Sequence, residues 1–261
     1  MTRKDSRLSF PPLKEKKMNH SILLCLLSLI GFVFEGLFIA SSCFENAVRT
    51  AILKTIASLI FVLIGLIGYH RLKKSSAENP GSKSTFGKST GALICTGLFL
   101  GMLGDIFLTL RFVFTSVSQP IFFIGIICFL SGHIFYLIAT VPKCRHIIAS
   151  LAAAMLIAVS IVLIYVRILE VTTLFKIAGI IYVGVIAFLT TSAFSNLLSN
   201  PRPPVILFAA GAFFFSTSDI LLMLVAFGSV KNLVFAGITL VLYYLGQMLI
   251  AHSVNQAAKE A

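Results

Sequence analysis

The chain has 261 residues, of which 58% are hydrophobic and only 11% are charged. A soluble domain carries about 25% charged residues, so the sequence excludes a fold that covers itself with polar surface in water. In hydrocarbon the backbone must form its own hydrogen bonds, which leaves helices or a closed barrel. The apolar stretches run for about 20 residues without strand-like alternation, which favours helices about 30 Å long.

The prediction is an all-α bundle of eight transmembrane helices. Together they form one transmembrane domain over residues 20–255, preceded by a basic tail at 1–19 and followed by a short tail at 256–261. A Ser-, Gly- and Lys-rich stretch at 72–90 is typical of a flexible loop. In chain order, the expected spans are 20–41, 51–71, 91–110, 120–140, 147–166, 174–196, 204–226 and 233–253.

The net charge of +12 does not indicate nucleic-acid binding, because the basic residues lie between the apolar segments. The two tails and the loops after the second, fourth and sixth spans hold fifteen of the 21 Lys and Arg, whereas the opposite loops hold five. Since cytoplasmic loops are enriched in Lys and Arg, both termini are predicted to be cytoplasmic. The expected location is a bacterial inner membrane or an endomembrane.

Nothing in the sequence indicates a metal or a cofactor. The five cysteines are scattered and have no paired spacing. Of the histidines, only His133 lies deep within a predicted span, and no pair has zinc-ligand spacing. Neither a glycine-rich phosphate loop nor a nucleophile elbow is present.

A weak internal sequence repeat indicates two parallel halves of four helices each. At a constant separation of 114 residues, Gly97 aligns with Gly211, Asp105 with Asp219, and Gly132 in the fourth span aligns with its counterpart in the eighth. Parallel repeats of this kind occur in membrane proteins, so a 4+4 repeat is a further expectation.

Three acidic residues, Glu35, Asp105 and Asp219, lie inside predicted spans. A carboxylate at a helix centre costs roughly 2.5–3.5 kcal/mol on insertion scales and indicates function by default. Helical rise places Asp105 about 10 Å and Asp219 about 13 Å below the outer ends of their helices. Because the two spans run in the same direction, both aspartates are expected at nearly one depth, across a shared cavity. The alternative is that each acid merely fastens helices together.

Other polar residues occupy the same zone. His133 and Tyr136 share one face of the fourth span, and Tyr243 and Gln247 share one face of the eighth. Together these residues predict a polar pocket that opens outward. Lys54, near the outer end of the second span, is expected to pair with Glu35 or to hold a substrate phosphate.

Four polar-containing segments stand out along the chain: GLFLGMLGDIFLTL (Gly97–Leu110), SGHIFYLIA (Ser131–Ala139), GAFFFSTSDILLML (Gly211–Leu224) and YYLGQMLIAHS (Tyr243–Ser253). In this order they resemble the signature helices of the YhhN family of lysoplasmalogenases. A fifth segment, ILKTIAS at Ile52–Ser58, resembles the family's lysine-bearing second helix, with Thr55 where a proline is common. The resemblance covers roughly residues 20–255.

The resemblance implies an eight-helix membrane enzyme that cleaves the vinyl ether bond of lysoplasmalogens. The products would be a fatty aldehyde and glycerophosphoethanolamine or glycerophosphocholine. Asp105 and Asp219 would be the catalytic acid and base, in an order left open. Lys54, His133, Tyr136, Tyr243, Gln247 and Glu35 would contact the substrate.

Two other functions remain open. One is a transporter or proton-coupled carrier, because four-plus-four repeats with acids near mid-membrane also describe many carriers. The other is a lipid-binding or assembly protein without catalysis. Expected partners are a lysophospholipid and membrane lipid, and a homodimer is compatible with the sequence without being indicated by it.

Overall fold

The computed structural model describes residues 20–42, 46–79, 81, 84–168, 173–227 and 233–261, and within these ranges it is entirely helical, without a strand. The predicted tail at 1–19 lies outside the described residues. Two short 3-10 helices, η1 (Thr115–Val117) and η2 (Val141–Lys143), flank the fourth long helix. The eight long helices are α1 (His20–Ser42), α2 (Ala47–Glu78), α3 (Lys88–Val113), α4 (Ser118–Thr140), α5 (Ile147–Ile168), α6 (Thr173–Ser199), α7 (Pro203–Phe227) and α8 (Leu233–Glu260).

All eight long helices are long and apolar enough to cross a membrane, which confirms the predicted fold class. Their outward faces are apolar as well: on α5, Ile148 is 83% exposed and Leu156 is 72% exposed. Contiguous apolar surface on this scale is not stable in water. The exposed faces therefore fit lipid, and the chain is a multi-pass membrane protein by length and composition.

Three helices, α2, α3 and α8, extend past the spans expected from the sequence. α2 continues to Glu78 and α3 begins at Lys88, so the predicted flexible loop at 72–90 was too long at both ends. α8 continues to Glu260, so most of the predicted tail at 256–261 is helical. Hydropathy marks where the hydrocarbon ends, whereas a helix continues into the aqueous zone when its polar residues are good helix formers.

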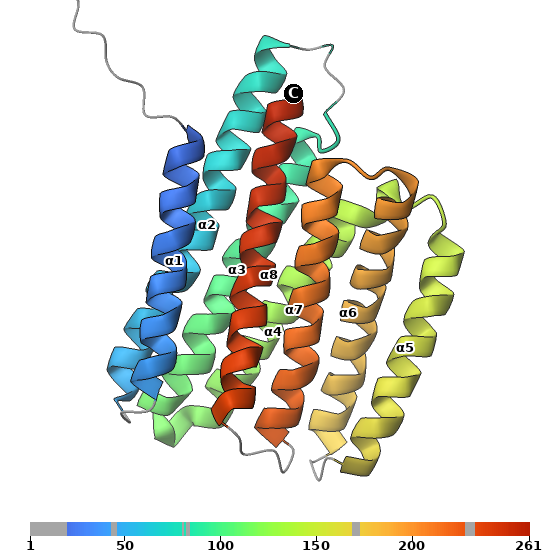
Figure 1. Ribbon diagram of the computed structural model, residues 1–261. Helices are drawn as coiled ribbons and strands as arrows, with labels where there is room; N and C mark the ends of the chain where they lie inside the picture. The colour runs from blue at the N-terminus through green and yellow to red at the C-terminus, as the bar shows by residue number, and fades with distance from the viewer. Residues whose placement is uncertain (1–19, 43–45, 80, 82–83, 169–172, 228–232) are drawn as a thin grey trace, which may run out of the picture.

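α8 lies at the centre of the bundle and packs against α7, α2, α1 and α3. α3 packs most extensively on α4, and α7 packs most extensively on α8. In Figure 1, α1 and α5 lie at opposite edges of the bundle, and α1 begins at the same end at which the chain terminates. An even number of spans requires this arrangement, although the predicted cytoplasmic orientation of that end stays a prediction.

Glycines allow the closest helix contacts. A Cβ placed on Gly97 of α3 would lie 3.0 Å from the carbonyl oxygen of Gly132 on α4. A Cβ on Gly211 of α7 would lie 2.7 Å from the carbonyl oxygen of Gly246 on α8. The glycine pair at the second crossing therefore lies 114 positions after the pair at the first crossing, residue for residue. These contacts support the 4+4 repeat, which itself stays a prediction.

Substituting Gly211 with Ala should separate α7 from α8, because the new methyl group would meet backbone atoms that cannot move aside. Overpacking of this kind costs roughly 1–3 kcal/mol, so we expect a lower melting temperature by circular dichroism in detergent. Gly184→Ala on α6 is the matched control, because its Cβ would have no described atom within 4 Å. Equal melting temperatures for the two variants would show that the crossing is not tight.

Candidate functional site

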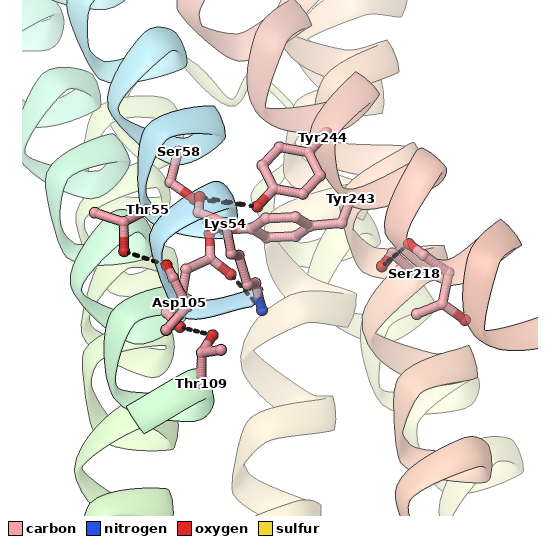
Figure 2. Close-up of polar contacts among 10 residues, drawn as sticks. Lys54, Thr55, Ser58, Asp105, Thr109, Ser218, Tyr243 and Tyr244 are labelled. Carbon is pink, nitrogen blue, oxygen red and sulfur yellow. Dashed lines mark hydrogen bonds and ion pairs between the residues drawn. The ribbon is translucent and has the colours of Figure 1, made fainter. Parts of the chain in front are cut away.

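Asp105, on the second half of α3, is almost fully buried and is surrounded by hydrogen-bond donors. Its Oδ1 lies 3.0 Å from the ammonium of Lys54, and its Oδ2 accepts hydrogen bonds from Ser58 (2.6 Å) and Tyr243 (2.7 Å). Lys54 and Ser58 lie one turn apart on α2 and present the same face to α3. Figure 2 shows Tyr243 reaching the group from α8. Because an ionised carboxylate only accepts, this environment fits the anionic form.

The pairing expected between Lys54 and Glu35 was wrong. Lys54 pairs with Asp105, and its ammonium also lies 5.7 Å from the centre of the Phe38 ring. Glu35 is 3% exposed, and its Oε1 has no hydrogen-bond partner among the described residues. Lys54 is drawn to Asp105 because α2 packs on α3, a contact that hydropathy does not reveal.

Asp219, on α7, has a different set of neighbours. Its Oδ2 accepts a hydrogen bond of 2.6 Å from Tyr182 on α6 and lies 3.4 Å from Nε2 of His133 on α4. The His133 contact has ion-pair distance but not the alignment of a hydrogen bond. Both contacts described for Asp219 involve Oδ2, and none is described for Oδ1.

The hydrogen bond on the other side of His133 fixes its tautomer. Nδ1 lies 2.8 Å from the carbonyl oxygen of Phe129, which can only accept, so Nδ1 carries a hydrogen. Nε2 then carries a second hydrogen only in the imidazolium form. Facing Asp219 at 3.4 Å, Nε2 can accept a proton from the carboxylic acid or, as the imidazolium, give one to the carboxylate.

Both aspartates line one cavity of about 460 Å³. It lies at the end of the bundle where α1 ends and α2 begins, the predicted outer end. α3 and α7 have few direct contacts, so the cavity rather than a helix interface is what the two acids share. Besides the two acids, its polar lining residues are Asn46, Thr50, Lys54, Thr109, Arg111, Ser218, Thr239 and Tyr243.

Arg111, one of the five basic residues counted in the predicted outer loops, lines the large cavity. It belongs to the last turn of α3, and its guanidinium carbon lies 4.5 Å from the centres of both the Phe112 and Phe122 rings. Its Nε is buried without a hydrogen-bond partner among the described residues. A cation held between aromatic rings with an unused donor is suited to an anionic ligand.

A smaller, mostly apolar cavity of about 100 Å³ adjoins the first one beside Asp219 and Arg111. It is enclosed by α3, α4, α6 and α7. Gly179 and Met223 contribute to its wall, and a Cβ added to Gly179 would lie 3.0 Å from the terminal methyl group of Met223. The other lining residues are Leu108, Phe122, Ile126, Phe129, Phe175, Ala178, Tyr182 and Leu222.

The remaining predicted residues divide into two groups. Tyr243 lines the large cavity, and His133 touches Asp219. Tyr136 donates a 2.8 Å hydrogen bond to Oε1 of Gln247, and neither residue lines the two cavities that contain Asp219. These two side chains join α4 to α8, whereas the sequence analysis had expected them to contact substrate.

Sequence reasoning missed three further polar partners, Ser58, Tyr182 and Tyr244. The hydroxyl of Tyr244 lies 3.3 Å from that of Ser58, which itself binds Asp105. Tyr182 is the single tyrosine of its span, and that was the only available signal for its role. Serine and tyrosine are common enough in membrane helices that their identity alone does not single them out.

No three His, Cys, Asp or Glu side chains within the described ranges gather closely enough to hold a metal ion. The expectation that no metal or cofactor takes part stays a prediction. Of the five cysteines, Cys25, Cys95, Cys128 and Cys144 are free, and Cys43 lies outside the described residues.

The sequence model of the YhhN family matches residues 49–254, which is most of the chain. The chain belongs to the YhhN family. No curated protein and no solved structure matches it. In this YhhN protein the matched region contains both aspartates, Lys54, Tyr182 and Arg111, whereas Glu35 lies outside it.

Removing the charge of Lys54 should strongly destabilise the protein, because Asp105 would become a buried, unpaired anion. Breaking a buried pair from one side costs roughly 3–5 kcal/mol, so Lys54→Met should melt well below the wild type in detergent. The double variant Lys54→Met/Asp105→Asn should recover most of the loss. Lys74→Met is the surface control, since its pair with Glu78 is exposed on both sides. A single Lys54 variant as stable as the Lys74 control would show that the pair does not stabilise the fold.

Proposed function

We propose that this YhhN protein is an intramembrane hydrolase that cleaves the vinyl ether bond of lysoplasmalogens. The observation that carries the proposal is that two buried aspartates with different partners line one cavity. Family membership is consistent with this activity, and the resemblance of the signature helices supplies the substrate class.

Hydrolysis of a vinyl ether requires a proton donor, a group that stabilises positive charge, and a water molecule. Protonation of the carbon distal to oxygen gives an oxocarbenium ion, and water adds to the carbon bonded to oxygen. Water addition releases one proton, and the neutral hemiacetal then collapses: its hydroxyl gives up a proton while the ether oxygen takes one up, which yields a fatty aldehyde and the glycerol hydroxyl. Glycosidases meet a similar requirement with two carboxyl groups.

The surroundings of the two acids favour different roles. Asp105, with three donors around it, is suited to remain anionic and to stabilise the oxocarbenium ion or orient water. Asp219 lies 3.4 Å from Nε2 of His133, a group that can take up or release a proton, so this pair is suited to deliver the proton to carbon and recover one from water. The Tyr182 hydroxyl would hold the Asp219 carboxyl group in place during transfer.

The two adjoining cavities offer separate places for the two ends of the lipid. Arg111 is the better candidate for the phosphate, because the Lys54 ammonium already pairs with Asp105. The alkenyl chain would enter the apolar cavity beside Gly179. This placement leaves the vinyl ether next to Asp219, which lines both cavities.

Asp105→Asn and Asp219→Asn should each lower aldehyde release from lysoplasmalogen by about 10²-fold or more, the usual scale for loss of an acid–base group. The assay uses purified protein in detergent, where no gradient exists, so that aldehyde formation also separates an enzyme from a carrier or a lipid binder.

Glu78→Gln provides the matched carboxylate-to-amide control at an exposed site, and it should retain full activity. Melting curves accompany each variant, because Asp105→Asn leaves Lys54 without its partner. Full activity in a folded Asp219→Asn protein would end the assignment.

Gly179→Met should fill the apolar cavity and shift preference toward shorter alkenyl chains. We expect kcat/KM for a sixteen-carbon substrate to fall by roughly tenfold relative to a ten-carbon one, on the scale of a few methylene contacts. Gly184→Met on the same helix is the control, because its Cβ would have no described atom within 4 Å. An unchanged chain-length profile in the Gly179 variant would place the lipid tail elsewhere.

A further inference from the structure

A second polar cavity, of about 330 Å³, lies at the opposite end of the bundle, where α2 and α8 end. Its volume falls within the range of small-molecule sites, and it shares no residue with the cavity that holds the aspartates. The polar residues that line it are Ser84, Thr85, Thr90, Thr140, Lys143, Asn196, Ser199, Asn200 and Arg202.

Basic side chains predominate in the lining of this cavity, although the Glu260 carboxylate accepts two hydrogen bonds from Thr85, one of the lining residues. Lys143 and Arg202 both line it, and none of the described lining residues is acidic. The ammonium of Lys143 donates to the Thr90 hydroxyl at 2.8 Å and lies 4.6 Å from the centre of the Phe86 ring. None of the ion pairs found among the described residues involves Lys143, so its charge is held in place without a carboxylate.

Asn196 supplies a buried acceptor in the same cavity. The residue is 8% exposed, and its Nδ2 donates a 3.0 Å hydrogen bond to the carbonyl oxygen of Thr140. That bond identifies the other amide atom as the oxygen, and this Oδ1 is buried without a partner among the described residues. A buried acceptor without a donor costs free energy, so a ligand group that donates a hydrogen bond to this oxygen would be favoured here.

We propose that this cavity binds a phosphate group that carries a neighbouring hydroxyl group, as in a glycerol phosphate. The phosphate oxygens would accept from Lys143 and Arg202, and the ligand hydroxyl would donate to Oδ1 of Asn196. Charge-assisted hydrogen bonds to phosphate are among the strong ones. This ligand chemistry belongs both to an anionic lipid headgroup and to a free phosphorylated metabolite. The inference is independent of the proposed hydrolysis, which takes place at the other end of the bundle.

The test is calorimetric titration of the full-length purified protein in detergent with three probes. These are sn-glycerol 3-phosphate, dioctanoyl phosphatidylglycerol and dioctanoyl phosphatidylcholine. The last is the control, because its headgroup has no net charge and no hydroxyl group. The variants are Lys143→Met, Lys143→Arg and the surface control Lys74→Met. Ser199→Asp is a second probe of the site, because Ser199 lines the cavity at an exposed position where substitution should not disturb folding.

Saturable binding should weaken about tenfold or more in Lys143→Met and Ser199→Asp, the factor that corresponds to one lost charge-assisted contact. It should be largely restored in Lys143→Arg and unchanged in Lys74→Met. Binding of sn-glycerol 3-phosphate with this dependence supports a free phosphorylated ligand, whereas binding of phosphatidylglycerol alone supports a lipid headgroup. No saturable binding to the wild type, equal binding of phosphatidylcholine, or equal affinity in Ser199→Asp would overturn the proposal.

Discussion

The burial of a carboxylate in hydrocarbon is the constraint that organises the centre of this bundle. Asp105 tolerates its position only because donors reach it from two other helices, Lys54 and Ser58 from α2 and Tyr243 from α8. Each donor fixes a distance between its helix and α3. The ion pair and the two hydrogen bonds therefore tie α2 and α8 to α3, in addition to neutralising a charge, and Lys54, Asp105 and Tyr243 also line the large cavity.

Asp219 shows why an internal sequence repeat does not imply equivalent chemistry at its matched positions. Asp219 occupies the position 114 residues after Asp105, and similar glycine contacts bring α4 to α3 and α8 to α7. Yet no Lys or Arg among the described residues lies within ion-pair distance of Asp219; Tyr182 and His133 take that place. Unmatched partners make two acids at matched positions chemically different, which suits the proposed division into an acid and a base.

The sequence predicts what depends on local pattern and misses what depends on contacts between helices. Eight apolar stretches were enough for the eight helices, and the cost of burying a charge drew attention to Glu35, Asp105 and Asp219 alike. The helix ends at Glu78 and Glu260 were not predictable from hydropathy, because they lie beyond the apolar segments. Partners such as Lys54 and Tyr182 depend on which helices are neighbours, and Arg111 depends on the rings beside it, neither of which has a local signature.

The choice between a structural and a catalytic interpretation depends on Asp219 more than on Asp105. A carboxylate paired with Lys54 and two hydroxyl groups is what a purely structural clamp would also look like. Asp219 lacks such a cation, and its histidine neighbour is charged only when it takes up a proton. A helix bundle gains little stability from a poorly aligned, proton-dependent contact at the edge of two cavities. That arrangement is costly for folding and useful for moving a proton, which is why the functional argument begins at Asp219.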